Sequence, residues 1–210
     1  RKRPPKTAKD ARKIMIAAHM DEIGMMVNHV DRNGLVHFSP LGNGFRRYVL
    51  GGRVRFLNST QGVIGAPFAD RLDNSNELPA LDKLHIDVGA TSQNDCPVKV
   101  GDVAAFDYPY QELGHCLVAK SMDNRVGVLV AIETLRKLKS TPYDVTFVFT
   151  TQAEVGRRGA VTSTYGVDPD IGIALDVTPA GGTSNSQRME IALGKGPCIK
   201  IQGAGMIADT

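Results

Sequence analysis

The sequence has few cysteines and no long apolar run, and both absences restrict the class of protein. Its three cysteines are Cys96, Cys116 and Cys198, an odd number with no CxxC spacing. This argues against a disulfide framework and predicts a reducing compartment. No apolar run approaches the ~18 residues that a membrane-spanning helix needs, and no signal-peptide pattern is present. We therefore expect a soluble, cytoplasmic protein with no membrane partner.

A strong excess of one charge is also missing. The formal net charge is +3, and much of it comes from Arg1, Lys2, Arg3, Lys6 and Lys9. Elsewhere Lys and Arg alternate with acidic residues, so no basic face is expected. A disordered terminus explains the basic run better than a nucleic-acid contact does. We predict no nucleic-acid partner.

The chain divides into three blocks with different patterns. Residues 1–46 contain a buried-type strand followed by a hairpin whose turn includes Asn33-Gly34, a dipeptide typical of tight turns. Residues 47–116 contain only short alternating runs separated by Gly, Pro, Asn and Asp, which is typical of a small all-β module. Residues 117–210 return to alternating strands and helices. The simplest architecture is an α/β domain interrupted by an inserted β domain.

The expected elements of the first and last blocks can be given by range. Strands are expected at 14–18, 116–120, 145–150 and 171–175, and helices at 126–138 and about 157–165. Asp123 or Asn124 is expected to cap the first helix, and Gly166 to end the second.

Residues suited to bind metal ions follow the apolar runs of these two blocks. They are His19 and Asp21 after 14–18, Asp123 after 116–120, Glu154 after 145–149, and Asp176 after 171–175. In an open α/β sheet, ligands collect outside the carboxyl ends of the strands. One His and three carboxylates at one sheet edge suit a two-metal hydrolase.

Each of these residues is ambiguous by itself. His19 alone is more often a buried, hydrogen-bonded histidine, and Asp123 alone is more often a helix N-cap. Asp176 ends a run with no other polar group, where an unpaired buried carboxylate would be costly. Asp21 lies two residues after His19 on the same face of an extended chain, so it can hold the second imidazole nitrogen. Their convergence on one edge favours the functional interpretation.

Five ordered segments of the chain form recognisable motifs. They are 17–24 (AAHMDEIG), 119–127 (AKSMDNRVG), 152–160 (QAEVGRRGA), 174–178 (ALDVT) and 194–197 (GKGP). The first three are similar to the AxHxDEIG, AKxxD[DN]RxG and QEEVGxRGA motifs of a known family, and the last two to further blocks of it. The chain therefore resembles the tetrahedral dinuclear aminopeptidases, which include glutamyl, leucyl, lysyl and deblocking aminopeptidases. The resemblance runs over nearly all of the chain.

The resemblance implies a role for each candidate residue. His19 and Asp176 would bind one metal ion, Asp123 would bridge two, Glu154 would bind the second, and Asp21 would orient His19. The two divalent ions would be Zn or Co, with Mn an option, and the substrates would be short peptides.

The resemblance also implies an architecture and an assembly. We expect an α/β, three-layer peptidase domain with a mixed sheet, formed by residues 1–46 and 117–210. An inserted small all-β dimerisation domain would span residues 47–116. Dimers formed through this β domain would build a tetrahedral dodecamer.

Two departures from the family pattern bear on activity. Ala153 stands where the family has the Glu that acts as general base, and loss of such a group typically lowers the rate about 10²–10⁴-fold. We expect the metal site to form and hydrolysis to be impaired. No His follows His115, so the family's C-terminal portion, with a late His that binds the second metal, is absent from these residues.

Other functions remain open at this point. The main alternative is a non-catalytic oligomeric homologue or fragment that binds peptides or assembles without turnover. A deacylase or carboxypeptidase could share the same metal plan. Some family members have been labelled glucanases, although the two-carboxylate chemistry of glycosidases needs no metal.

Overall fold

The computed structural model describes residues 1–5, 10–42, 49–67, 79–180, 191–203 and 206–208. The chain forms two compact units, Arg1–Asp176 and Val177–Thr210, and each is described by itself. The expected boundary between residues 46 and 47 lies outside the described residues, as do Lys6 and Lys9 of the basic run.

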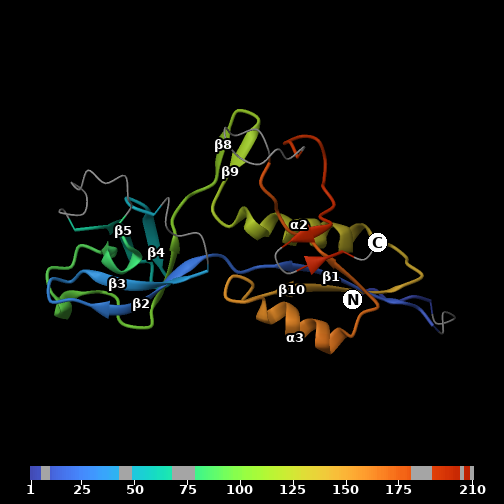
Figure 1. The fold of residues 1–210 in the computed structure, drawn as a ribbon, viewed down its shortest axis with the longest axis horizontal. Helices are drawn as coiled ribbons and strands as arrows, with labels where there is room; N and C mark the ends of the chain where they lie inside the picture. The colour runs from blue at the N-terminus through green and yellow to red at the C-terminus, as the bar shows by residue number, and fades with distance from the viewer. Residues whose placement is uncertain (6–9, 43–48, 68–78, 181–190, 204–205, 209–210) are drawn as a thin grey trace. The chain divides into compact units, whose positions relative to one another are not determined.

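The first unit contains a parallel three-stranded sheet with the order β10-β1-β11 (Figure 1). Its strands are β1 (Lys13–His19), β10 (Asp144–Thr150) and β11 (Ile171–Ala174). The strand expected at 171–175 ends one residue earlier, and the other two were predicted to within a residue. Nearly continuous apolar runs are typical of such parallel strands, because helices cover both faces of the sheet. Since all three strands point the same way, their carboxyl ends meet at one edge.

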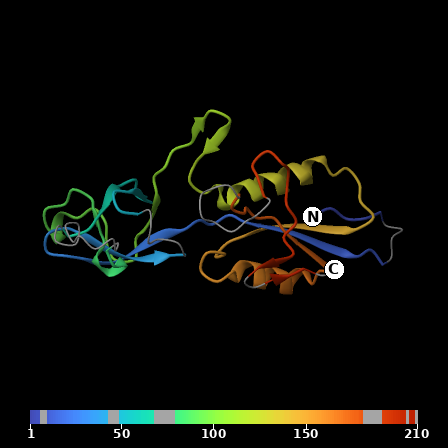
Figure 2. The ribbon, with the colours of Figure 1, turned by 45° about the horizontal axis from the view of Figure 1, so that its top comes forward.

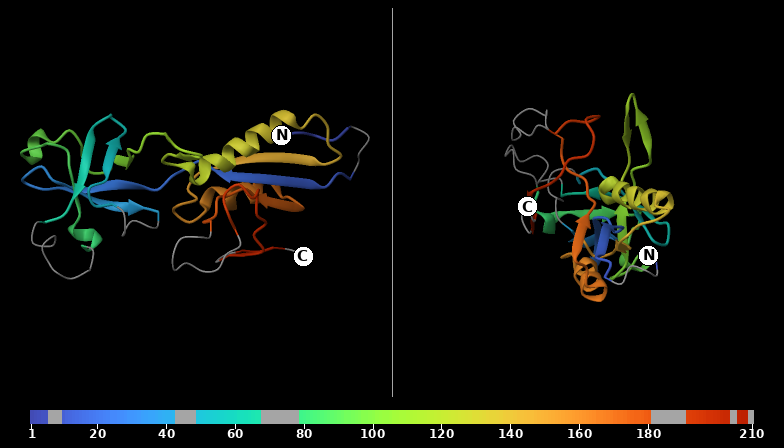
Figure 3. Two further views of the ribbon diagram at one scale, coloured as in Figure 1. Left: turned by 90° about the horizontal axis from the view of Figure 1, so that it is seen from above. Right: turned by 90° about the vertical axis from the view of Figure 1, so that its right-hand side faces the viewer.

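Two helices lie on opposite faces of this sheet, which gives the expected three layers (Figures 2 and 3). They are α2 (Met122–Lys137) and α3 (Arg158–Val167). The one antiparallel contact among the described residues of this sheet is an isolated bridge between Lys2 and Val145.

Both helices differ from expectation at one end. α2 begins at Met122 after Ser121, while Asp123 and Asn124 have non-helical backbone angles within its first turn. α3 continues past Gly166 to Val167, and its C-cap is Asp168 in the left-handed conformation. The prediction of a glycine stop was wrong because Asp, like Asn, can adopt this conformation through local hydrogen bonding of its short side chain.

Six antiparallel strands form a closed barrel in the order β2-β3-β6-β5-β4-β7. They are β2 (Gly24–Val30), β3 (Val36–Leu41), β4 (Arg53–Phe56), β5 (Gln61–Gly65), β6 (His85–Asp87) and β7 (Val103–Phe106). Alternate side chains point inward; in β4, for example, Val54 and Phe56 are buried and the two arginines are exposed. Two 3-10 turns, η1 (Leu81–Lys83) and η2 (Gln93–Asp95), lie between β5 and β7.

The barrel draws strands from two of the expected blocks. β2 and β3 come from the segment 1–46, which the sequence assigned to the peptidase domain, and the other four come from 47–116. β2 pairs with β7, and β3 pairs with β6. Without this hairpin β6 and β7 would be open edges, which proteins avoid by closure. Alternation along the sequence shows that a segment is a strand but does not show with which distant strand it pairs.

The segment 116–120 does not join the parallel sheet, so that expectation was wrong. β9 (Cys116–Val118) instead pairs antiparallel with β8 (Gln111–Leu113) in a two-stranded hairpin. All six side chains of this hairpin are exposed. A partner only a short turn away needs little loop closure, so the local pairing forms at low entropic cost. As a result, Asp123 approaches the sheet from the start of α2.

The second unit has little regular structure among its described residues. Two short strands, β12 (Gln202–Gly203) and β13 (Met206–Ile207), pair antiparallel, and the GKGP segment begins in a turn. Among the described parts of both units, no helix combines the length and apolar character needed to cross a bilayer.

Candidate metal centre

The parallel sheet positions two of the predicted ligands through its backbone. His19 ends β1, and Asp176 lies two residues past the end of β11. The N–H of the residue after His19 donates to Thr150 O at 2.8 Å, and the N–H of Leu175 donates to Ala17 O at 2.8 Å. The hydrogen-bond ladder therefore extends one residue beyond the strand ends on both sides of β1.

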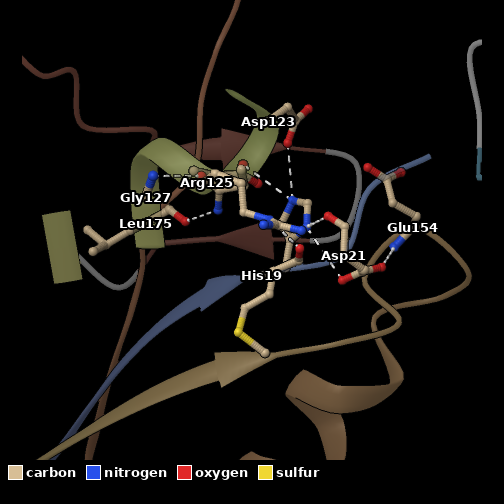
Figure 4. Close-up of polar contacts among 10 residues, drawn as sticks. His19, Asp21, Asp123, Arg125, Gly127, Glu154 and Leu175 are labelled. Carbon is tan, nitrogen blue, oxygen red and sulfur yellow. Dashed lines mark hydrogen bonds and ion pairs between the residues drawn. The ribbon is translucent and has the colours of Figure 1, made fainter. Parts of the chain in front are cut away.

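Two of the predicted carboxylate ligands, Asp123 and Asp176, lie close to the His19 ring, and Figure 4 shows the contact between His19 and Asp123. His19 Nε2 lies 3.1 Å from Asp123 Oδ1 and 3.9 Å from Asp176 Oδ1. One ligand atom from each of these three residues lies within 4.8 Å of the others. The His19 side chain is 12% exposed, whereas Asp123 and Asp176 are 62% and 60% exposed. The imidazole is largely buried and the two carboxylates are accessible, so a cation that enters from solvent could contact all three side chains.

Asp21 contacts both His19 and the turn that carries Glu154. His19 Nδ1 lies 3.1 Å from the backbone carbonyl of Asp21 and 3.6 Å from its Oδ1. The N–H of Glu154 donates to Asp21 Oδ2 at 3.1 Å, while Oδ1 is buried without a hydrogen-bond partner. The imidazole is thus held most closely by the carbonyl, which fixes the ring much as a carboxylate would.

Glu154 lies in the turn after β10 and is partly buried. Burial, followed by the negative charge of Asp123, raises the pKa of its carboxyl, and the charges of Asp21 and Asp176 act in the same direction. His19 opposes this effect. A nearby cation would offset the repulsion and favour the ionised form.

Ala153 directly precedes Glu154 and has no proton to exchange. Its carbonyl accepts hydrogen bonds from the N–H groups of Gly156 and Arg157, at 3.3 and 3.0 Å. These backbone bonds close the turn. Neither these bonds nor the one from the Glu154 N–H to Asp21 involves the side chain at position 153.

A model of the M42 glutamyl aminopeptidase family matches residues 4–210 of this sequence. The chain belongs to that family.

Relatives of this M42 chain carry aminopeptidase names. It is 42% identical over 199 residues to a provisionally named aminopeptidase of Acetivibrio thermocellus, covering 93% of this chain and 59% of the relative. It is 32% identical over 202 residues to a lysyl aminopeptidase of Pyrococcus furiosus, covering 91% and 58%. The M42 chain thus spans a little under 60% of the length of these relatives.

Solved structures share its fold. An aminopeptidase from the archaeon Desulfurococcus kamchatkensis has a TM-score of 0.81 at 40% identity, with 90% of this chain and 54% of that chain covered. The TET1 peptidase of Pyrococcus horikoshii, which can assemble into a tetrahedron or a large octahedral shell, has a TM-score of 0.73 at 29% identity, covering 90% and 59%. The α/β sheet with an inserted six-stranded barrel is therefore an M42 architecture.

The donor set of this M42 chain fits a divalent cation. Among the described residues, His19, Asp123 and Asp176 form one cluster of possible oxygen and nitrogen ligands, and Asp21 lies on the other side of the imidazole. Glu154 is not in this cluster, although its carboxyl interacts electrostatically with Asp123 and Asp176. Such oxygen and imidazole ligands suit Zn, Co or Mn better than soft copper sites. Asp21 Oδ1 is buried without a hydrogen-bond partner, and burial, followed by the charge of Asp123, raises the pKa of Glu154. A cation would compensate both carboxylates.

The sequence reasoning did not find the side chains that hold the start of α2. Lys120 Nζ donates to both carboxylate oxygens of Glu22, at 2.7 and 2.8 Å, and Ser121 Oγ also bonds this carboxylate. Asn124 and Arg125 bond to backbone carbonyls near the other ligands. The motifs could have indicated these residues. Of the five, all except Ser121 occupy defined motif positions next to the expected ligands.

Proposed function

We propose that this chain carries the metal-binding part of a two-metal aminopeptidase that releases N-terminal residues from short peptides. The observation that carries the proposal is the convergence of His19, Asp123 and Asp176 at the carboxyl ends of adjacent parallel strands and the start of α2. Family membership supports the same reaction class.

The residues of this chain divide between two cations. His19 and Asp176 would hold the first, Asp123 would bridge both, and Glu154 would hold the second, with Zn or Co as the metal and Mn as an option. When bound, two such ions act as Lewis acids and lower the pKa of a water toward ~7. Asp21 keeps the His19 ring oriented, through its carbonyl at 3.1 Å, and supports the Glu154 turn through its carboxylate.

The proposed reaction lacks an acid–base group at position 153, where this chain has Ala153. Peptide hydrolysis requires a proton to leave the attacking water and a proton to reach the departing amine. A carboxylate at position 153 could carry both, but a methyl group can carry neither. We propose that the chain binds metal and peptide and turns over slowly, with a deficit of about 10²–10⁴-fold from the missing acid–base group.

Self-association is the remaining part of the proposal. The barrel would mediate dimers, and dimers would build a tetrahedral dodecamer. Support comes from the Pyrococcus horikoshii relative, which forms a tetrahedron or an octahedral shell, and from exposed apolar side chains on the barrel, among them Val63. Light scattering should give the mass of a dodecamer, and a monomeric mass would contradict this part.

The reaction is tested by restoring the acid–base group. Ala153→Glu should raise the release of N-terminal residues from short peptides by about 10²-fold or more. Ala153→Gln is the matched control, because it has the same size but no exchangeable carboxyl proton, and it should leave the rate unchanged. Chelator should abolish the gain.

The alternatives predict other outcomes of the same assay. Tight peptide binding with no turnover after Ala153→Glu would favour a non-catalytic homologue. Release from the carboxyl end, or of acyl groups, would indicate another metallohydrolase. Chelator-resistant cleavage of glucans would indicate a glycosidase.

A further inference from the structure

Asp123 differs from the other two clustered ligands in how its backbone is held. His19 and Asp176 follow adjacent strands of one sheet, and backbone hydrogen bonds continue past both strand ends. Asp123 belongs to the first turn of α2 and follows a hairpin outside that sheet. Sheet pairing therefore does not set its distance from the other two ligands.

Asn124 links this turn to the chain just before Asp176. Its side chain is fully buried, its Nδ2 donates to Leu175 O at 2.7 Å, and its Oδ1 accepts from Gly127 N at 3.1 Å. Buried polar side chains are retained at a cost unless they are hydrogen-bonded. Both polar atoms of this amide therefore bond to backbone groups, one in α2 and one in the residue before Asp176.

Arg125 makes the corresponding link to the chain just after His19. Its Nε donates to Met20 O at 2.6 Å (Figure 4), while its own N–H bonds Ser121 O within the first turn. The side chain is otherwise exposed. The two residues after Asp123 thus reach two carbonyls, each belonging to a neighbour of another ligand.

We propose that Asn124 and Arg125 are positioning residues, which hold Asp123 at the correct distance from Asp176 and from His19. Neither residue contacts the cation. This inference rests on the proposed metal-binding function. Groups that orient metal ligands typically change metal affinity about 10–100-fold when removed, so the effect belongs in the affinity for metal and not only in stability.

Three variants test the proposal by calorimetric titration with Co²⁺. Asn124→Leu replaces both amide atoms with methyl groups, and Arg125→Met puts a methyl group at the place of Nε. Both should weaken Co²⁺ binding about 10–100-fold. Arg125→Gln keeps an N–H donor at the same position along the side chain and should bind Co²⁺ as the unmodified chain does. The visible absorption bands of bound Co²⁺ should shift in the first two variants only.

A fourth variant separates positioning from general stability. Ala131 is a fully buried residue of α2, eight positions after Asp123, and Ala131→Gly destabilises a helix interior. It should lower the melting temperature of the metal-free protein and leave Co²⁺ affinity unchanged. The proposal is overturned if Asn124→Leu or Arg125→Met behaves in the same way.

The remaining outcomes are also decisive. If Asn124→Leu does not fold, the exposed Arg125 carries the test, since its replacement removes no buried group. If the unmodified chain binds no Co²⁺, or His19→Ala binds it equally well, the proposed metal site itself fails. If His19→Ala abolishes Co²⁺ binding but either apolar variant binds Co²⁺ normally, the metal site stands and the positioning proposal fails.

Discussion

The barrel and the parallel sheet differ in how many apolar side chains they bury and in how much they depend on polar contacts. Among the described residues, fifteen of the nineteen buried apolar side chains belong to the barrel core. The other four (Met15, Ala18, Ala131 and Val145) belong to the sheet and α2. On the helices, Leu129 is 57% exposed and Tyr165 is 91% exposed. The barrel has a closed core of its own, whereas the predicted metal ligands lie in a region held mainly by hydrogen bonds and charge.

This difference is physically reasonable for the proposed metal site. A closed barrel removes sheet edges and buries alternate residues from every strand. A metal site needs accessible polar groups at a sheet edge, where unpaired charges oppose folding until a cation arrives. The comparison predicts that the barrel responds to lost volume and the sheet region to lost charge or hydrogen bonds.

The largest effect should come from emptying the barrel core. Phe56 is buried on β4, and Phe→Ala in a core typically lowers stability by about 3–5 kcal/mol. Denaturant unfolding of Phe56→Ala should show a loss in that range. Leu57, the next residue, is exposed, so Leu57→Ala is the matched control and should be nearly neutral. A loss below about 1 kcal/mol for Phe56→Ala would mean that the barrel is not the stable part.

The sheet region should gain its main stabilisation from metal. At a free metal concentration of 100 times Kd, binding adds about 2.7 kcal/mol to the free energy of unfolding. Zn²⁺ or Co²⁺ should therefore raise the melting temperature of the unmodified chain but not that of His19→Ala. His29→Ala, on the exposed face of β2, should keep the full shift. An equal rise in melting temperature in His19→Ala and His29→Ala would mean that the metal binds elsewhere.

A backbone contact behind the Glu154 turn gives the next effect. In Gly159 of α3, a Cβ atom would lie 2.3 Å from Thr151 O, which is main chain and cannot rotate away. Gly159→Ala should cost about 1–3 kcal/mol through overpacking and weaken metal binding by moving Glu154. Gly166 lies in the same helix, and a Cβ atom added there would meet nothing within 4 Å. Gly166→Ala should be neutral or slightly stabilising, and equal losses at both glycines would contradict the close contact.

The smallest effect concerns pH, and it should have opposite signs in the two regions. Hydrogen bonds from Thr91 and Ser92 lower the pKa of Asp95 to about 2, so its contribution is present above pH ~4 and is lost as pH falls toward 2. The pKa of Glu154 is raised in the folded chain, chiefly by burial. In the metal-free protein this carboxyl therefore destabilises the fold as pH rises above its unfolded pKa of ~4.3.

Unfolding measured across this range checks both signs. Glu154→Gln should remove the loss of metal-free stability on raising the pH above ~4.3, and Asp95→Asn should remove part of the loss at acidic pH. Excess metal should suppress the Glu154 effect, because a cation favours the ionised form. Identical pH profiles for Glu154→Gln and the unmodified chain would show that Glu154 lies outside the charge cluster.

Local patterns in the sequence were enough to locate most elements. The strands at β1 and β10, the alternating barrel strands and the central part of both helices were predicted, because side-chain periodicity follows from local backbone geometry. The motifs also identified the family. The predicted ligands His19, Asp123 and Asp176 are brought together by the fold, while the roles assigned to them, and those of Asp21, Ala153 and Glu154, remain predictions.

The chain's partners in space were decided only by the tertiary structure. The sequence determined which segments form strands, which residue types follow them and that Ala153 carries no proton. It did not determine that β2 and β3 close the barrel, that β9 leaves the sheet, or that Asn124 and Arg125 reach carbonyls beside the other ligands. Such contacts join residues up to about a hundred positions apart, as in the Arg125–Met20 bond (|i−j| of 105). Side-chain periodicity describes only local backbone geometry, so it does not predict these long-range contacts. Each such contact closes a long loop, and its free energy depends on how the intervening segments fold.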